Sequence, residues 1–292
     1  MTAPHKLQAP SADLTAADPS AWRSYDEFAA GIDTFRLPDA SLAGTALALT
    51  LDDGSELSLA FDAERVRWSA TGALATQAEA HDPYEAVRVR DDVVFVHLPL
   101  SSRELEALTV VYSETTHRAL VVRSVIGPAA SASPDTDASA NGTASPTPDE
   151  PRVSQTFWSA VTDGGEPSGE VPGPSRDLIG KRNLYRYSPF HLYEHVYISS
   201  ERYAWQCVQG VQRGHGDMDL STVWKFADGL YLFCFREFRI AVASVWLHDL
   251  GYALRTTGAF LGLNGAGEAE HSRAGGYIYP IGSVSYPDVQ PV

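Results

Sequence analysis

Residues 185–197 read Tyr-Arg-Tyr-Ser-Pro-Phe-His-Leu-Tyr-Glu-His-Val-Tyr, and this stretch decides the fold. On each side of its Ser-Pro step, large aromatic residues recur at every second position. That alternation places Tyr185 and Tyr187 on one face of a strand, and Tyr193, His195 and Tyr197 on one face of the next. The stretch therefore predicts two neighbouring strands whose aromatic side chains point together into a β-barrel.

Short runs with the same period-two pattern continue on both sides of this stretch and are separated by turn sequences such as Asp52-Asp53-Gly54. Spacings of roughly 8 to 12 residues between strands are typical of small antiparallel barrels. We therefore expect an all-β protein made of two lipocalin-like or calycin-like antiparallel β-barrels. The expected strands are 46–51, 57–61, 65–70, 84–89, 93–98, 108–112, 119–126, 181–187, 192–198, 202–208, 221–226, 230–236, 240–247, 253–258 and 276–279.

Composition separates the two barrels along the chain. Residues 38–127 should form the first barrel, and residues 174–292 should form the second, which carries the expected active site. Residues 128–173 are rich in Pro, Ser, Ala, Asp, Thr and Gly, so they bury too little apolar surface to order themselves. We expect a disordered linker there, tacked onto a barrel by Phe157 and Trp158.

The N-terminal residues 1–37 begin polar and then show roughly helical spacing from Trp22 to Phe35. We expect a short helix there that caps a barrel. The N-terminus lacks the charged, apolar and small-residue regions of a signal peptide, and no apolar run approaches the roughly 18 residues that span a bilayer. A cytoplasmic location is therefore expected.

The overall charge restricts the class of partner. A formal net charge of −15 and an isoelectric point near 4.9 disfavour nucleic acid and anionic membranes. A small-molecule substrate is the expected partner, and the chain is expected to form a homo-oligomer. Cys207 and Cys234 lie inside apparent strands, which favours buried free thiols over a disulfide or metal pair.

The two halves resemble an internal duplication. Leu-Ala-Gly at 42–44 and Leu-Ile-Gly at 178–180 open them, and a Trp follows each Gly after 24 or 25 residues. Projection of the reactive residues of the second half onto the first gives only leucines. The pairs are Tyr185 with Leu49, Tyr187 with Leu51 and Glu237 with Leu100. The second half should therefore contain the active site.

Four residues are candidates for catalysis. Tyr185 and Tyr187 can donate hydrogen bonds to an oxygen that gains negative charge. Glu237 shares a strand face with aromatic residues, and burial among them would raise its pKa toward the neutral range that a general acid or base needs. His215 lies between two glycines, where it can approach a ligand, with Asp217 to orient its ring.

A further set of residues on the same strands and loops is expected to bind the substrate. Most are aromatic, and each falls on the inward face of its strand or beside the glycine-flanked histidine. The predicted set is Tyr193, His195, Trp205, Arg213, Tyr231, Phe233 and Phe235. No metal or cofactor is expected in the cavity.

Each of these candidates also has a structural interpretation. The tyrosines can form aromatic core packing with hydroxyls at the rim, and Glu237 can form a salt bridge with Arg239. Residues 191–195 spell His-x-x-Glu-His, a zinc signature that requires a helix. On a strand His191 and His195 share one side while Glu194 points to the other, so the alternation disfavours a zinc hydrolase.

The second half resembles the molybdenum cofactor biosynthesis protein F family, or MoaF. Four segments carry the resemblance, and a weaker one covers the first half from about Gly44 to Gly127. The segments are Asp-Leu-Ile-Gly-Lys-Arg at 177–182, Tyr-Arg-Tyr-Ser-Pro at 185–189, His-Leu-Tyr-Glu-His at 191–195 and Arg-Gly-His-Gly-Asp at 213–217.

The same half is also similar in pattern to the phenolic acid decarboxylases, which are cofactor-free lipocalin-like barrels. Tyr185 and Tyr187 fall on their Tyr-x-Tyr pair, Tyr193 on a further tyrosine, and Glu237 on their catalytic glutamate. His215 falls where those enzymes have an arginine, so the binding of a substrate carboxylate is in doubt unless Arg213 or Arg186 supplies the cation. The resemblance implies a ligand cavity inside the second barrel, but it does not transfer the substrate.

These observations lead to one expected function and two alternatives. We expect a cofactor-independent lyase, isomerase or cyclase that acts on a small aromatic or conjugated metabolite, in the manner of secondary metabolism. The first alternative is a ligand-binding barrel without catalysis, whose cavity would be aliphatic and whose Glu237 would be salt-bridged. The second is the zinc hydrolase through His191, Glu194 and His195.

Overall fold

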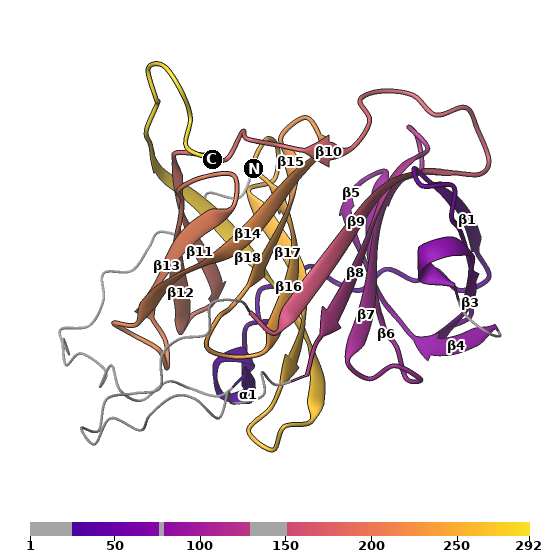
Figure 1. Ribbon diagram of the computed structural model, residues 1–292, viewed down its shortest axis with the longest axis horizontal. Helices are drawn as coiled ribbons and strands as arrows, with labels where there is room; N and C mark the ends of the chain where they lie inside the picture. Colours follow the sequence, from indigo (N-terminus) through magenta and orange to yellow (C-terminus); the bar gives the residue numbers. More distant parts are fainter. Residues whose placement is uncertain (1–24, 76–78, 129–150) are drawn as a thin grey trace, which may run out of the picture.

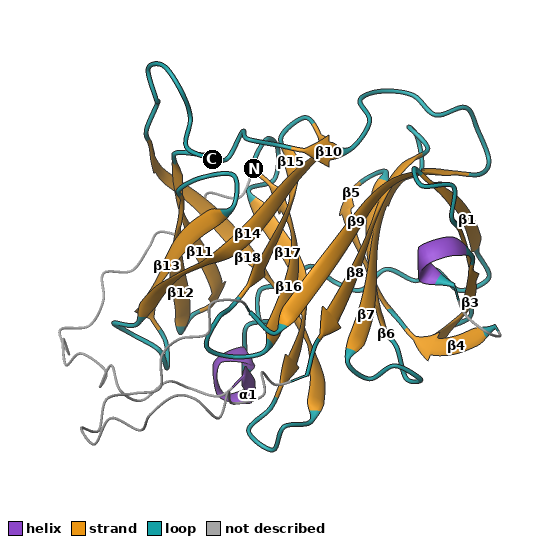
Figure 2. Cartoon of the chain, in the orientation of Figure 1, coloured by secondary structure: helices purple, strands orange, loops and turns teal. Residues whose placement is uncertain are grey.

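Two antiparallel β-barrels lie side by side in the computed structural model, which describes residues 25–75, 79–128 and 151–292 (Figure 1). Strands make up nearly all the regular structure of these residues (Figure 2). Neighbouring strands mostly follow chain order, so alternate residues of each strand point into a barrel. The prediction of an all-β protein with two antiparallel barrels is confirmed. The predicted helix start at Trp22 and most of the predicted linker, 129–150, lie outside the described residues.

The N-terminal barrel is a nine-stranded sheet in the order β4-β3-β2-β1-β9-β8-β7-β6-β5. A short 3-10 helix, Gly72–Leu74, connects β3 to β4. The strands are β1 Ala46–Leu51, β2 Glu56–Phe61, β3 Arg65–Ala70, β4 Ala80–Pro83, β5 Glu85–Arg90, β6 Val93–Pro99, β7 Glu106–Ser113, β8 Arg118–Ile126 and β9 Val153–Thr162.

The C-terminal barrel consists of β11 to β18 and is closed, because β14 pairs with both β13 and β15. A two-residue strand, β10, pairs with Trp224 and Lys225 near the end of β14. The strands are β10 Gly173–Pro174, β11 Lys181–Ser188, β12 His191–Tyr197, β13 Arg202–Gln209, β14 Gly216–Ala227, β15 Leu230–Arg236, β16 Val242–Asp249, β17 Arg255–Leu263 and β18 Ala269–Ser283.

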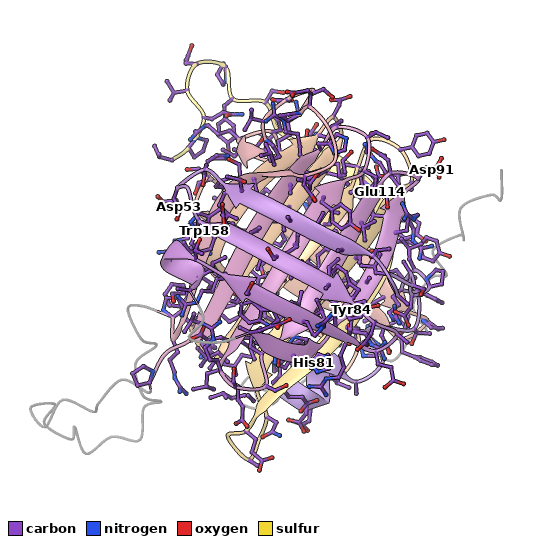
Figure 3. The ribbon with its side chains drawn as sticks, turned by 90° about the vertical axis from the view of Figure 1, so that its right-hand side faces the viewer. Asp53, His81, Tyr84, Asp91, Glu114 and Trp158 are labelled. Carbon is purple, nitrogen blue, oxygen red and sulfur yellow. The ribbon has the colours of Figure 1, made fainter. Side chains whose placement is uncertain are left out.

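A strand break explains why the N-terminal barrel is only nearly closed. In the C-terminal barrel the first part of β14 pairs with β13 and the rest with β15. In the N-terminal barrel β4 pairs with β3, whereas β5 pairs with β6. Tyr84 lies between β4 and β5, and its hydroxyl donates to the carbonyl of Asp62 at 3.0 Å (Figure 3). The pair β4 and β5 thus corresponds to one β14 that is interrupted at Pro83 and Tyr84.

The linker prediction was wrong for the second part of 128–173. Residues 153–162 form β9, which pairs with both β1 and β8 inside the N-terminal barrel. Trp158 is buried there, and its Nε1 donates to Asp53 at 2.9 Å (Figure 3). The outward-facing Ser, Gln and Thr of β9 give it the composition of a linker, although its inward positions are buried. The linker composition of these residues concealed the strand, which the sequence analysis did not predict.

The two barrels pack through a broad apolar face. A core cluster joins Val89 and Phe95 of the first barrel to Leu232 and Leu247 of the second. Phe157 of β9 stacks on Trp224 of β14 with ring centroids 5.7 Å apart (18° between planes). Polar contacts also cross the interface. Arg90 pairs with Asp249 at 2.9 Å, Gln155 Nε2 donates to the Ser244 carbonyl at 2.9 Å, and a ring nitrogen of His97 lies 3.2 Å from one of His271. The two halves therefore form one packed body.

A short helix, α1 (Tyr25–Ala29), covers one end of the C-terminal barrel, as the predicted cap requires (Figure 1). Tyr25 is fully buried, and the Phe28 ring meets the Phe260 ring edge to face at 5.8 Å. The backbone N–H of Phe35 donates to the Tyr187 carbonyl at 3.0 Å, which fixes the chain after the helix. Within the described ranges, no helix has the length and apolar character needed to cross a membrane.

The interiors of the two barrels differ in chemistry. Aliphatic side chains dominate the first interior, and Leu49, Leu51 and Leu100 are all buried in it. Aromatic side chains dominate the second, together with buried histidines. Both cysteines are buried free thiols, as predicted.

Gly258 makes room for the aromatic interior of the second barrel. It lies opposite Trp246 in the β16–β17 ladder, and a Cβ at Gly258 would approach the indole ring to 2.4 Å. The indole is almost fully buried, so it can retreat only by displacing its neighbours or by filling the cavity that it lines.

We expect Gly258→Ala to lower the free energy of unfolding by about 1–3 kcal/mol, the usual cost of overpacking a core. Urea denaturation would measure the loss. Gly282→Ala is the matched control, because no atom lies within 4 Å of its added Cβ, and it should change stability by less than about 0.5 kcal/mol. Equal effects of the two substitutions would contradict the packing argument.

Candidate functional site

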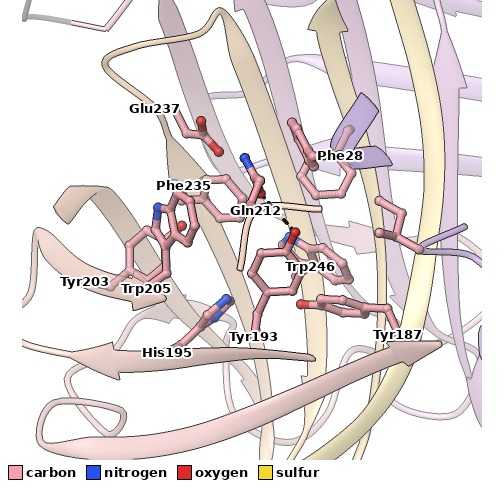
Figure 4. Close-up of a pocket in the computed structure, with 12 residues that line it drawn as sticks. Phe28, Tyr187, Tyr193, His195, Tyr203, Trp205, Gln212, Phe235, Glu237 and Trp246 are labelled. Atoms are coloured by element: carbon pink, nitrogen blue, oxygen red, sulfur yellow. Dashed lines mark hydrogen bonds between the residues drawn. The ribbon is translucent and has the colours of Figure 1, made fainter. Parts of the chain in front are cut away.

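A small cavity lies inside the C-terminal barrel beneath α1 (Figure 4). Its volume is about 40 Å³, enough for a few water molecules but not for a metabolite. Every barrel strand that lines it contributes aromatic or polar side chains, while α1 and the following turn contribute apolar ones. The lining residues are Phe28, Ile32, Tyr187, Tyr193, His195, Tyr203, Trp205, Gln212, Phe235, Glu237, Trp246 and Phe260.

Glu237 is the carboxylic acid of this cavity. It follows β15 directly, continues the inward face of Phe233 and Phe235, and is 8% exposed. Its carboxyl group points toward the cavity (Figure 4) and forms no ion pair or hydrogen bond with any described residue. The salt bridge between Glu237 and Arg239, which the sequence left open as an alternative, is not formed. Arg239 pairs with Asp217 at 2.8 Å instead.

Burial and nearby acids both disfavour ionisation of Glu237. Loss of solvation raises its pKa well above the usual range, and the charges of Asp219 and Asp217 raise it further. Burial also raises the pKa of Asp219 to about 6, although its hydrogen bond from Trp205 opposes the shift. Both effects favour the protonated form of Glu237, which is the form that a general acid needs.

Hydroxyl and amide groups face Glu237 across the cavity. The Tyr193 hydroxyl donates to Gln212 Oε1 at 2.9 Å, and the Gln212 amide lies between Tyr193 and Glu237 (Figure 4). The Tyr187 hydroxyl also faces the cavity (Figure 4), and no described residue accepts its proton. Burial raises the pKa of Tyr187 and of Tyr193 well above 10, so both remain neutral donors.

His195 supplies a neutral imidazole at the bottom of the cavity. Burial lowers its pKa to about 3, and its Nδ1 is buried with no hydrogen-bond partner among the described residues. Its ring packs on the Tyr185 ring with centroids 4.3 Å apart. The Tyr185 hydroxyl is itself hydrogen-bonded to the Tyr197 hydroxyl at 2.6 Å. Tyr185 and Tyr197 therefore support the floor of the cavity from below.

A buried Trp–Asp clamp fixes the end of β15, where Glu237 lies. Trp205 Nε1 donates to Asp219 Oδ2 at 2.9 Å. The other carboxylate oxygen of Asp219 accepts the backbone N–H of Phe238 at 3.3 Å. Because Phe238 directly follows Glu237, the clamp holds the glutamate side chain toward the cavity.

The N-terminal barrel contains the same clamp with the same spacing. Trp68 Nε1 donates to Asp82 Oδ2 at 2.8 Å, and Asp82 Oδ1 accepts the backbone N–H of Ser101 at 2.9 Å. The Trp-to-Asp spacing is 14 residues and the spacing from Asp to the backbone donor is 19 residues in both halves. The residue before the donor is Leu100 in one barrel and Glu237 in the other. The clamp supports the duplication, and one barrel has a carboxyl group where the other has a leucine.

Six of the eleven predicted site residues line the cavity, and they come from four different strands and the rim. They are Tyr187, Tyr193, His195, Trp205, Phe235 and Glu237. The alternation rule placed these side chains on the inward face correctly.

The other five predicted residues do not line the cavity. Tyr185 lies below it, and Phe233 packs between the floor tyrosines and His248. Tyr231 lies at the start of β15, and its hydroxyl donates to Asp177 at 3.0 Å. His215 is buried on the loop after β13, and Arg213 lies half-buried on the same loop. Period-two alternation gives the face of a strand but not the height along the barrel, which explains why Tyr185, Tyr231 and Phe233 lie away from the cavity.

Six lining residues were not predicted as site residues. Tyr203 has the same alternation as Trp205 and could have been found from it. Trp246 and Phe260 lie on β16 and β17, which carry none of the predicted site residues. Gln212 comes from a loop, and Phe28 and Ile32 come from the cap, so no strand pattern indicates them.

The His-x-x-Glu-His string lies on a strand, β12, as the alternation predicts. Glu194 faces outward, where it bonds to Arg182 and Gln206. His191 Nδ1 bonds to the Ser188 hydroxyl at 2.7 Å. No group of three His, Cys, Asp or Glu side chains in the described part of the chain has the geometry of a metal site.

Comparison with known proteins places the chain in a family. The MoaF N-terminal domain model matches residues 20–128, and the MoaF C-terminal domain model matches residues 172–284. The chain belongs to the MoaF family. Glu237, the glycine-flanked loop and most of the cavity lining fall in the MoaF C-terminal domain, whereas Phe28 and Ile32, which also line the cavity, belong to the MoaF N-terminal domain.

One curated relative and one solved structure can be set beside these MoaF domains. Protein MoaF of Klebsiella aerogenes is 44% identical over 98 residues, which cover 34% of this chain and 37% of that protein. The chain thus matches only a little over a third of that relative's length. The crystal structure of a proposed beta-lactamase from Burkholderia vietnamiensis has a TM-score of 0.31 at 14% identity, over 36% of this chain and 95% of that one. A likeness this weak supports no conclusion.

We expect Glu237→Gln to stabilise the protein increasingly as the pH rises from about 4.5, the ordinary pKa of Glu. The folded protein binds the Glu237 proton more tightly than the unfolded chain does, so wild-type stability falls as pH rises toward the raised pKa. Glutamine carries no titrating proton. Urea denaturation of both proteins across this pH range measures the difference.

Glu114→Gln is the control for this experiment. Arg88 holds the pKa of Glu114 below its ordinary value, so removal of that surface carboxylate should give no gain at higher pH. A constant difference between Glu237→Gln and wild type would contradict the raised pKa of Glu237.

We further expect Asp219→Asn to lower the pKa of Glu237, because it removes a neighbouring negative charge. Carbon-13 NMR of labelled Glu carboxyl groups, with Glu237→Gln to assign the signal, measures this. Asp82→Asn is the control, because it alters the equivalent clamp of the N-terminal barrel. Both substitutions should lower the free energy of unfolding by about 1 kcal/mol, but Asp82→Asn should leave the pKa of Glu237 unchanged. Equal titration shifts in both variants would refute a local effect.

Proposed function

We propose that the protein is a cofactor-independent acid–base enzyme of the lyase, isomerase or cyclase type. Its substrate would be a small aromatic or conjugated metabolite, as in secondary metabolism, bound inside the C-terminal barrel. The observation that carries the proposal is the buried carboxyl of Glu237, which no described residue pairs with and which faces an aromatic cavity with hydroxyl donors on its opposite side. Carboxyl groups are rarely buried without a partner unless they have a chemical role.

In the proposed reaction Glu237 transfers a proton. As a carboxylic acid it donates to a substrate carbon or leaving oxygen, and as the resulting carboxylate it accepts a proton from a second position. Tyr187 and Tyr193 donate hydrogen bonds to the substrate oxygen on which negative charge develops. Double-bond migration, dehydration, decarboxylation and cyclisation each use these two elements.

The geometry changes two roles that the sequence suggested. The Tyr185 hydroxyl is engaged by Tyr197, so Tyr185 supports His195 and the cavity floor instead of contacting the substrate. His215 lies outside the lining, and Gln212 from the same loop takes the place nearest the acid.

The substrate enters by displacing the cap. The cavity of about 40 Å³ is too small for an aromatic metabolite, so one wall must move. The barrel strands are held by continuous backbone ladders, whereas Phe28 and Ile32 come from α1 and its following turn. We propose that this segment opens to admit the ligand and closes over it to exclude water.

The test is turnover by the purified full chain on a panel of conjugated aromatic compounds, followed by mass spectrometry. Loss of CO2 or of water identifies a lyase, and product of unchanged mass identifies an isomerase or cyclase. We expect Glu237→Gln to lower kcat by about 10²-fold or more, because it removes the proton donor. Tyr187→Phe should lower kcat by about 10²-fold, because it removes an oxyanion donor.

The controls are Glu194→Gln, on the outward face of β12, and Tyr84→Phe, in the N-terminal barrel. Both should keep wild-type turnover. Full activity of the Glu237→Gln and Tyr187→Phe proteins would disprove the mechanism. Tight binding of panel compounds without any product would instead support the alternative of a non-catalytic ligand carrier.

A further inference from the structure

The described part of the cavity lining carries no cation. None of the twelve lining residues that the structure describes is Lys or Arg. Its histidine, His195, is neutral near physiological pH because burial disfavours its charged form. Besides the Glu237 carboxyl, its polar groups include the hydroxyls of Tyr187, Tyr193 and Tyr203, which burial keeps neutral, and the amide of Gln212.

Nearby arginines are directed elsewhere. The Arg186 guanidinium donates to the carbonyls of Ser188 and Pro189, outside the barrel. Arg239 pairs with Asp217 at 2.8 Å. Arg213 lies on the loop that carries Gln212, but it is not part of the lining. Among the described residues, no arginine therefore reaches the cavity to bind a substrate carboxylate.

Acidic groups surround the cavity instead. Glu237 lies in its wall, and Asp219 and Asp217 lie close enough to raise the pKa of Glu237. A ligand carboxylate would lose its hydration on entry and would gain no opposite charge in return. Repulsion by the acids would add to that cost. Protonation of Glu237 would remove its own share of this repulsion but would supply no positive charge to balance the ligand carboxylate.

An uncharged ligand meets none of these obstacles. The rings of Trp205, Phe235 and Trp246 offer stacking surfaces for a planar conjugated system. Tyr187 has a hydroxyl that faces the cavity with no acceptor among the described residues, so a ligand oxygen can accept its hydrogen bond. A protonated Glu237 can donate to the same ligand without charge repulsion.

We propose that the cavity binds an uncharged, planar conjugated carbonyl or phenol compound and rejects carboxylates. This inference rests on the proposed function because it concerns the same cavity. It adds the chemical class of the substrate. It predicts that the reaction acts on a neutral enone, aldehyde or phenol, and that decarboxylation of an aromatic acid is not the reaction.

The test compares two probes of nearly equal shape. Benzylideneacetone carries a methyl ketone where cinnamate carries a carboxylate, which is ionised at neutral pH. Isothermal titration calorimetry with the full chain should show that the ketone binds at least about tenfold more tightly than cinnamate, a difference set by one uncompensated charge. Tyr187→Phe should weaken ketone binding about fivefold, the value of one hydrogen bond. Tyr84→Phe should leave it unchanged.

Each outcome decides the matter. Cinnamate binding as tight as ketone binding would overturn the inference, as would absence of ketone binding or an unchanged affinity in Tyr187→Phe. Selective ketone binding without turnover of any neutral compound would keep the inference and refute the proposed enzyme. Turnover of cinnamate or another aromatic acid with loss of CO2 would refute the inference and keep the proposed enzyme.

Discussion

The buried hydrogen bond between a tryptophan N–H and an aspartate organises both barrels. In each half the aspartate also accepts a backbone N–H where the strand beyond it ends, so one side chain joins three segments of the barrel wall. A polar clamp of this kind fixes position more sharply than apolar packing does, because its donors are costly to leave unpaired. In the C-terminal barrel it determines where Glu237 points.

The two barrels show how one framework can serve two purposes. With Leu49, Leu51 and Leu100 inside, the first barrel has a filled aliphatic core and contributes stability and the packed face between barrels. With tyrosines and Glu237 at the corresponding places, the second barrel has a polar aromatic interior. Buried acids and imidazoles that lack partners reduce stability, which is common where function sets the residue.

The sequence was sufficient for most of the fold, because strict alternation indicates a strand and its inward face. It failed at β9, whose polar outward residues resemble a linker, and at β4, which is only four residues long. For the site, alternation found Tyr187, Tyr193, His195 and Glu237 but could not distinguish the level of Tyr185 or Phe233 from that of the cavity. Gln212 and Phe28 reach the cavity from a loop and a cap, and only tertiary packing decides such positions.

The cap has a consequence for the modularity of the protein. Phe28 and Ile32 precede the first barrel in the chain, yet they close the second, and the chain then returns to the first barrel through the bridge between Asp39 and Val87. The C-terminal domain contains the acid and the hydroxyls but not its own roof. The cavity is therefore a joint product of both domains, and neither half could be inherited or exchanged alone without opening the interior of the second barrel to water.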